Sequence, residues 1–224
     1  MEEANMFDFE DGEGLVPAHR HTNPDGSIGG WVADTATVED TATIGRNAWV
    51  CDNAKVSGNS RVLDNARICE EAQVYGDSQV FDDAWIYGKA SVYGEARVYG
   101  HSQVYGEARV YGESLVFGHS QVYGESLVFG HSQVYGEALV FGHSQVYGEA
   151  EVSGESLVFG HSQVYGHSQV YGEAQVYGHS QVFDDAWIYD KASVYGEAQV
   201  YGDSQVFGKA EVSGTECIKD WMKC

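Results

Sequence analysis

A branched aliphatic residue recurs at every sixth position along most of this chain. Val or Ile occupies each such position from Val32 to Ile218, without an insertion or deletion. Two residues before it stands Ala or Ser, from Ala36 to Ala210, and two residues after it a glycine is common. The small and aliphatic residues alternate with polar or aromatic neighbours, so each unit predicts a short strand that ends in a glycine turn.

A solenoid of stacked coils explains this unit better than a meander of hairpins. In a meander, residues paired across a two-residue loop share a face, so Val98 would share its face with Gln103 and no apolar face would form. In a solenoid, valine stacks on valine and the polar residues stay outside. Three units give 18 residues per coil and a triangular cross-section. The sequence therefore predicts an all-β fold, a single-stranded parallel β-solenoid over residues 32–218 with about 10–11 coils at ~4.8 Å per coil.

The repeat also resembles a known group of proteins. The unit ARVYGH at Ala96–His101 is similar to the hexapeptide repeat of left-handed parallel β-helices, and the left hand of the coil is what this resemblance implies. The segments Leu15–His21 and Gly29–Val32, with the A-x-V-Y-G units, resemble uncharacterised bacterial and phage repeat proteins that are labelled acyltransferase-like or polymer-forming by similarity only. The enzyme families usually carry a small or acidic residue after the aliphatic one, whereas this chain carries Tyr or Phe.

The two ends of the chain lie outside the regular repeat. Residues 1–31 are expected to form an N-terminal cap over the open edge of the first coil, because bare strand edges promote association. The apolar residues available for this cover are Met6, Phe7, Phe9, Leu15, Val16 and Trp31. Residues 219–224 form a short C-terminal tail, and the segment 217–224 has the apolar side chains of Ile218, Trp221 and Met222 with which to fold back over the last coil. An incomplete cover there would leave an edge for end-to-end contact.

Aromatic residues occupy an outward position in nearly every unit. The residue after the aliphatic is Tyr or Phe from Tyr75 to Phe207, except at Ser153, and all 15 tyrosines belong to this set. Residues 18 apart stack, so the candidate interaction surface consists of columns, which either only stabilise the rod or also bind a partner. These columns comprise Tyr75, Tyr93, Tyr111, Phe129 and Tyr147 on one face, and Tyr87, Tyr105, Tyr123, Phe141, Phe159, Tyr177 and Tyr195 on another. The other outward position holds Leu115, Leu127, Leu139 and Leu157, which widen the apolar surface.

The charge balance limits the partners. The chain has 12 Lys and Arg against 34 Asp and Glu, a formal net charge of −22. No basic surface is available to release counterions from phosphates or to bind anionic lipids, so neither nucleic acid nor a membrane is an expected partner. The acidic N-terminus lacks the features of a secretory signal, and no run of about 18 apolar residues occurs, so we expect a cytoplasmic protein.

Few residues point to catalysis, and we expect no cofactor, metal or catalytic residue. Cys51 and Cys69 stack on one outward column, where two reduced thiols are favoured over a disulfide or a soft-metal pair. Stacked histidines at the turns are read as solvated residues that dilute carboxylate repulsion, although such a ladder can bind Zn²⁺ or Cu²⁺. His101 or His119 would serve as a general base only if a trimer formed a cleft, because no loop interrupts the coils to build a pocket.

These observations favour a structural function. The first hypothesis is a non-enzymatic scaffold that self-associates, as a homo-oligomer or filament, through its aromatic faces or its C-terminal edge. The alternative is a rod-like binding module whose aromatic columns hold a glycan or a partner protein. A trimeric acyltransferase-like enzyme is the third hypothesis.

Overall fold

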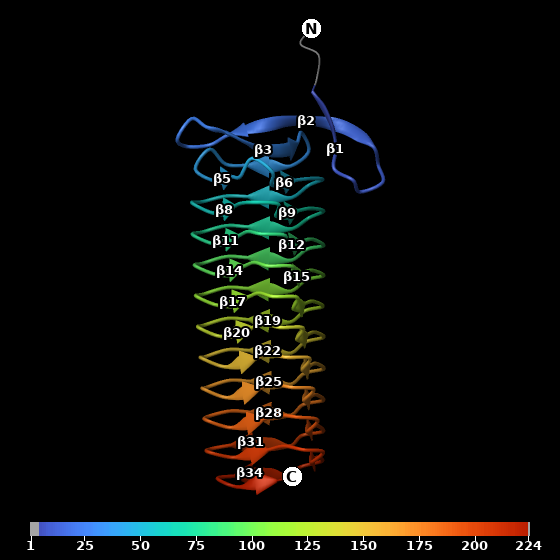
Figure 1. Ribbon diagram of the computed structural model, residues 1–224, viewed down its shortest axis with the longest axis vertical. Helices are drawn as coiled ribbons and strands as arrows, with labels where there is room; N and C mark the ends of the chain where they lie inside the picture. The colour runs from blue at the N-terminus through green and yellow to red at the C-terminus, as the bar shows by residue number, and fades with distance from the viewer. Residues whose placement is uncertain (1–4, 224) are drawn as a thin grey trace.

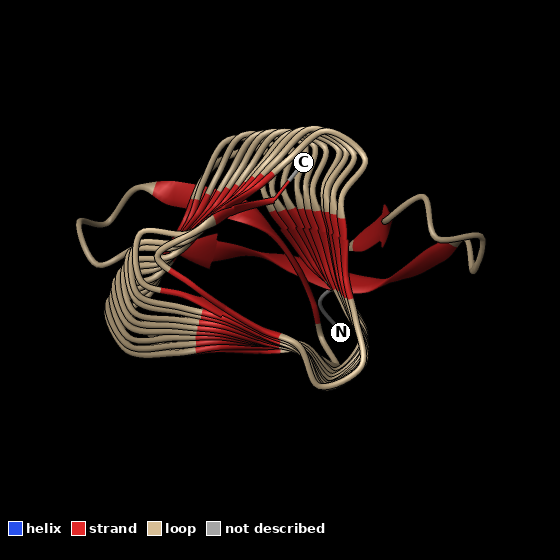
Figure 2. Cartoon of the chain, turned by 90° about the horizontal axis from the view of Figure 1, so that it is seen from below, coloured by secondary structure: helices blue, strands red, loops and turns tan. Residues whose placement is uncertain are grey.

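The computed structural model describes residues 5–223 and confirms the predicted fold class. The chain forms an upright stack of parallel β coils with the N-terminus at one end and the C-terminus at the other (Figure 1). Viewed end on, the strands lie on three sides of a triangle (Figure 2). Strand partners are 18 residues apart, as Val104 and Val122 are, so each side of the triangle is one parallel sheet of about 11 coils.

We name the three sides of the rod by their sheets. Face 1 contains β3 (Ile28–Ala33), β6 (Trp49–Val50), β9 (Arg67–Ile68), β12 (Trp85–Ile86), β15 (Gln103–Val104), β18 (Gln121–Val122), β21 (Leu139–Val140), β24 (Leu157–Val158), β27 (Gln175–Val176), β30 (Ser193–Val194) and β33 (Glu211–Val212). The same sheet is extended at its N-terminal end by β1 (Met6–Asp8) and β2 (Leu15–Thr22).

The other two sheets contain 11 strands each. Face 2 contains β4 (Thr37–Val38), β7 (Lys55–Val56), β10 (Gln73–Val74), β13 (Ser91–Val92), β16 (Arg109–Val110), β19 (Leu127–Val128), β22 (Gln145–Val146), β25 (Gln163–Val164), β28 (Gln181–Val182), β31 (Gln199–Tyr201) and β34 (Cys217–Lys219). Face 3 contains β5 (Thr43–Ile44), β8 (Arg61–Val62), β11 (Gln79–Val80), β14 (Arg97–Val98), β17 (Leu115–Val116), β20 (Gln133–Val134), β23 (Glu151–Val152), β26 (Gln169–Val170), β29 (Trp187–Ile188), β32 (Gln205–Val206) and β35 (Met222–Lys223).

The interior is built from the two inward positions of each unit. The aliphatic residues from Ile44 to Val212 are fully buried, and Ala or Ser fills the narrow space beside each turn. Burying serine is possible because its hydroxyl finds acceptors: Ser102 Oγ donates to the carbonyl of Tyr99 at 2.8 Å and lies 3.4 Å from that of Val116. No buried side-chain nitrogen or oxygen among the described residues lacks a hydrogen-bond partner.

The corners depend on a left-handed backbone residue. Glycine usually occupies this position, as at Gly118 with φ +76°, but aspartate replaces it in several coils. Asp82 has φ 57°, and its Oδ2 accepts the N–H of Gly100 in the next coil at 3.1 Å. Asp190 does the same for Gly208. This bond offsets the cost of a side chain in a region that favours glycine.

The N-terminal cap covers two sides of the first coil with hydrogen bonds. β2 crosses the end of the rod and pairs antiparallel with both β1 and β3 (Figure 1). The Asn23 side chain accepts the N–H of Ile44 at 2.8 Å and donates to its carbonyl at 3.2 Å, and His21 Nε2 donates to the carbonyl of Ala42. The cap therefore satisfies backbone groups at the edge of face 3 that another strand would otherwise take.

The apolar part of the cap lies on the side of the rod and not over its end. Phe7 stacks on Trp31 with ring centroids 4.6 Å apart, and Phe9, only 3% exposed, packs against Trp49. The expectation that Met6 and Leu15 would cover the end is wrong, because they are 47% and 65% exposed. The reason is that β1 pairs with the outer edge of β2, so its side chains reach the outer surface of face 1.

The C-terminal tail continues the coil and does not fold back over it. Ile218 lies in register with Val200, and β35 adds a further strand beside β32. Trp221 and Met222 are 63% and 62% exposed, so neither covers the last coil. Within the described part of the chain, the C-terminal strands therefore end in an open edge, whereas at the N-terminal end the cap covers the edges of faces 1 and 3 and leaves β4 as the edge strand of face 2.

Candidate interaction surface

The aromatic columns form with the predicted spacing on all three faces. On face 1 the column runs unbroken from Tyr87 to Tyr195, and on face 2 from Tyr75 to Tyr201. Adjacent rings are nearly parallel: Phe141 and Phe159 lie 4.9 Å apart at 1°. On face 3 the column is interrupted at Ser153. The position of every candidate ring agrees with the sequence, and the role of these rings as an interaction surface stays a prediction.

Stacking hides the faces of the rings. Each ring within a column has a neighbour on both sides at about the spacing of the coils, so its edge, and not its π-face, meets the solvent. Such pairs stabilise the fold by about 0.5–1.5 kcal/mol beyond area burial. Stabilisation therefore accounts for the stacks themselves, and a binding role needs a further observation.

The tyrosine hydroxyls are held close to the surface. Tyr105 donates to Gln121 Oε1 in the next coil at 3.2 Å, and Tyr195 donates to Glu211 Oε2 at 2.9 Å. Burial raises the pKa of Tyr87 to about 12, and Tyr105 and Glu70 contribute by repelling its anion. Burial also raises the pKa of Tyr93, Tyr99, Tyr105, Tyr111, Tyr123, Tyr147, Tyr165, Tyr171 and Tyr177.

These shifts predict a loss of stability at high pH. As pH rises above about 10, the tyrosines of the unfolded chain lose protons before those of the folded chain do. The tyrosine contribution to the free energy of unfolding should therefore be fully present below about pH 10 and be lost as pH approaches 12. Thermal melts at pH 8, 10 and 11 measure this loss. A variant with Tyr87, Tyr105 and Tyr123 changed to Phe keeps the rings and should lose less stability between pH 10 and 11; an equal loss would contradict this origin.

Face 1 carries the most apolar part of the surface. Leu139 and Leu157 are direct strand neighbours there, and they flank Phe141 and Phe159. Leu115 on face 3 and Leu127 on face 2 each stand between an arginine and a glutamine. The four residues Leu139, Phe141, Leu157 and Phe159, which we call the apolar centre of face 1, therefore have no counterpart on the other faces.

Histidines and carboxylates line the corners as ladders. His143, His161 and His179 stack with centroids 4.7 and 4.9 Å apart, between faces 1 and 2. His143 Nδ1 lies 3.4 Å from a carboxylate oxygen of Glu125, an exposed pair of small energetic value. The predicted stacking of these turn residues is thus observed.

A surface groove of about 640 Å³ runs along one edge of face 1. It is lined by His101, Gln103, His119, Gln121, Glu137 and Leu139. The two histidines stack at 4.9 Å, and His101 Nδ1 is 3.7 Å from Asp83. This groove contains acid and base groups, but their side chains are largely exposed, and a general base is normally activated by burial or by an orienting partner.

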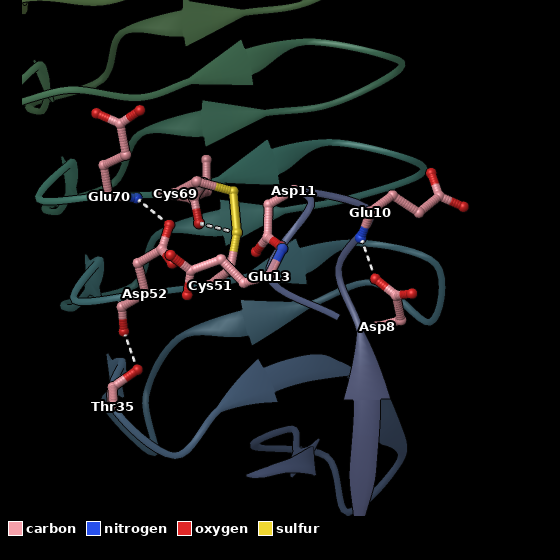
Figure 3. Close-up of a disulfide and its surroundings, with 10 residues drawn as sticks. Asp8, Glu10, Asp11, Glu13, Thr35, Cys51, Asp52, Cys69 and Glu70 are labelled. Carbon is pink, nitrogen blue, oxygen red and sulfur yellow. Dashed lines mark hydrogen bonds between the residues drawn. A yellow bond between two sulfur atoms is a disulfide. The ribbon is translucent and has the colours of Figure 1, made fainter. Parts of the chain in front are cut away.

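The expectation of two reduced thiols at Cys51 and Cys69 is wrong. Their Sγ atoms are 2.01 Å apart in a disulfide that joins adjacent coils, with the Cα atoms 4.6 Å apart (Figure 3). The 18-residue spacing places the two cysteines side by side, and Phe9 helps to bury Cys51 to 1% exposure. Disulfides persist mainly in oxidising compartments, whereas the cytoplasm keeps thiols reduced. This bond therefore disagrees with the expected cytoplasmic location. Cys217 is free and exposed.

One group of metal-binding side chains occurs among residues 5–223. Ligand atoms of Cys51, Asp52 and Cys69 lie within 4.8 Å of one another, beside an acidic groove that includes Asp11 and Glu70 (Figure 3). The disulfide engages both sulfurs, and a thiolate is the form that binds a metal. Asp52 is instead occupied as an acceptor for the N–H of Glu70 at 2.8 Å. In the oxidised form the group therefore does not offer a metal site.

Comparison with known proteins assigns neither a family nor a function. No family model matches the chain, and no curated protein has significant sequence similarity to it. Within residues 5–223, no helix has the length and apolar character needed to cross a membrane.

Proposed function

We propose that the protein is a non-enzymatic scaffold, a rod that self-associates side by side through an aromatic face. The observation that supports this most is the apolar centre of face 1, where leucines and phenylalanines lie together on an exposed sheet between two tyrosine stacks. Contiguous apolar patches of this kind typically mark protein interfaces. The free energy gained by burying this apolar centre must outweigh the electrostatic repulsion between two chains, each of net charge −22.

Side-by-side contact fits the two ends of the rod better than growth into an end-to-end filament does. The cap bonds to the first coil through Asn23 and His21 on face 3, and β2 pairs with β3 on face 1, so a further coil cannot be added on these two sides. Among the described residues the C-terminal edge is open, and the cap favours its contact with another C-terminal edge over contact with the N-terminal end. End contact therefore closes after two copies, whereas the faces remain available along the whole rod.

A glycan-binding rod is the second candidate. Sugars pack on the faces of aromatic rings, and these columns offer such a face only where a stack ends, as at Tyr75. The hydroxyls and amides beside the rings could still bind polar groups. An acyltransferase remains third, because the His101 groove lies open along the surface of the rod.

Removing one aromatic stack tests the proposal. Changing Tyr123, Phe141, Phe159 and Tyr177 to Thr keeps a residue that favours strands at each position but removes the centre of the face 1 stack. We expect association, measured by sedimentation velocity, to weaken at least about tenfold. The matched control changes Tyr93, Tyr111, Phe129 and Tyr147 on face 2 to Thr, and circular dichroism checks that both variants stay folded. Equal association of all three chains would exclude face 1.

A further inference from the structure

Face 1 carries complementary charged groups along its two edges. In each coil, one turn residue precedes the face 1 strand and another, six positions later, follows it. In the consecutive coils from β12 to β30, one of these two turn residues is acidic and the other is His or Lys. The pairs are Asp83 and Lys89, His101 and Glu107, His119 and Glu125, Glu137 and His143, Glu155 and His161, Glu173 and His179, and Lys191 and Glu197.

The other two faces do not keep this pattern. The edges of face 2 carry like groups in several coils, as at Glu107 with Glu113 and His161 with His167. Face 3 also has like pairs, such as Glu149 with Glu155. Unbroken complementarity thus coincides with the face that contains the apolar centre.

We propose that two copies of this chain pair in parallel, face 1 against face 1, about a two-fold axis that runs along the rods. This inference rests on the proposed self-association. Such an axis keeps each coil at its height and exchanges the two edges of the face. Each edge residue then lies opposite the complementary residue of the other copy: His143 faces the partner's Glu137, and Glu137 faces the partner's His143. Every pair in the series is made twice, as an isologous interface requires.

The apolar centre fits the same arrangement. The exchange places Leu139 opposite the partner's Phe141 and Leu157 opposite the partner's Phe159, so the four apolar residues bury one another. Sheets packed face to face lie about 10 Å apart, which leaves the turn residues at the rim of the contact. A shifted register would bring like charges together at the rim and is therefore disfavoured. The complementary rim thus determines the orientation of the pair more than its affinity.

An antiparallel pair that keeps the apolar centre in the middle of the contact would match the charges poorly. A two-fold axis across the rods, centred between Phe141 and Phe159, brings each edge against itself. Glu137 would then face the partner's Glu155, and Glu107 would face the partner's Glu197.

In the parallel pair the histidine ring donates an N–H to a carboxylate whether or not the ring is protonated, so the contact does not require a fully charged histidine.

Exchange of charges across face 1 tests the pairing. The first variant changes His143 and His161 to Glu, which opposes carboxylate to carboxylate in the parallel pair. The second adds Glu137→His and Glu155→His, which restores every pair and leaves the composition equal to that of the original chain. A control changes His131 and His167, at the corner opposite face 1, to Glu. All these positions are exposed turns, and circular dichroism verifies the fold of each chain.

Sedimentation velocity separates the outcomes. We expect the first variant to associate at least about tenfold more weakly than the original chain, the control to change less, and the exchanged chain to recover. If the exchanged chain stays as weak as the first variant, the parallel arrangement is wrong. If none of the changes affects association, face 1 is not the contact. An original chain that stays monomeric at all concentrations would instead overturn the proposed function itself.

Spin labels measure the orientation independently. With Cys217 and Cys224 changed to Ser, a label at Glu71→Cys near the N-terminal end should lie at the same height as its equivalent in a parallel pair, so that only the width of the face separates the two labels. In the antiparallel pair the two labels would be separated by about 40 Å along the rods, from the ~4.8 Å spacing of coils. A distance of that size or more would overturn the parallel arrangement.

Discussion

Changing Val134 to Asp is expected to break the rod at its middle. Val134 is fully buried and stacks between Val116 and Val152, so no cationic group can reach a carboxylate placed there. An uncompensated buried charge costs roughly 3–5 kcal/mol. Because each coil contacts only its neighbours, the damage should start locally and leave two partly stable blocks. Limited proteolysis followed by mass spectrometry should show new cleavage close to residue 134.

The matched control for this variant places the same charge on the surface. Gln145 points outward in β22, and its strand neighbours Leu127 and Gln163 carry no charge. Gln145→Asp should cost less than about 1 kcal/mol, the range of strand propensities. If Val134→Asp resisted unfolding and proteolysis as well as Gln145→Asp does, the inward assignment of the aliphatic column would be wrong.

Changing Gly118 to Ala is expected to destabilise a corner of the rod. Gly118 has φ +76°, and an added Cβ would lie 3.0 Å from both the nitrogen and the oxygen of Gly136 in the next coil. The left-handed conformation alone costs an alanine about 1–2 kcal/mol, and the close contact adds to it. Chemical denaturation of both chains measures the difference in the free energy of unfolding.

Aspartate at the same position provides the control. Asp82 stands two coils earlier at this corner and uses its carboxylate to accept a backbone N–H of the following coil. Gly118→Asp can make the same bond to Gly136, and the neighbouring histidines His101 and His119 tolerate the added charge. It should therefore cost less than Gly118→Ala. The opposite order would show that the carboxylate bond does not compensate for the strained backbone.

The regular part of the fold follows from local pattern alone. The six-residue period places every valine of the repeat inward and every tyrosine outward, and it sets the partner of each strand 18 residues away. No long-range information is needed, since each coil repeats the environment of the previous one. The aromatic columns on faces 1 and 2 were predictable for the same reason.

The structure of the N-terminal cap and the redox state of Cys51 and Cys69 could not be predicted from the six-residue repeat. Phe7 and Phe9 reach the side of the rod because β1 pairs with the outer edge of β2, and nothing in the order of residues indicates that pairing. The 18-residue separation of Cys51 and Cys69 predicts that they lie side by side, but not whether they are oxidised.

The corner aspartates were a missed signal that the sequence does contain. At most coils the position two residues after the aliphatic is Gly, and Asp82, Asp184 and Asp190 replace it. Aspartate is one of the few residues that adopts the left-handed conformation with help from its own side chain. Reading these substitutions as hydrogen-bonded corners, and not as irregularities, would have predicted the bonds to Gly100, Gly202 and Gly208.

Sedimentation equilibrium of the unmodified chain over a wide range of concentrations tests the scaffold proposal most directly. If face 1 pairs as proposed, the weight-average mass should rise with concentration from the monomer mass of 24.5 kDa towards at least twice that value. A mass that stays at 24.5 kDa throughout would contradict self-association.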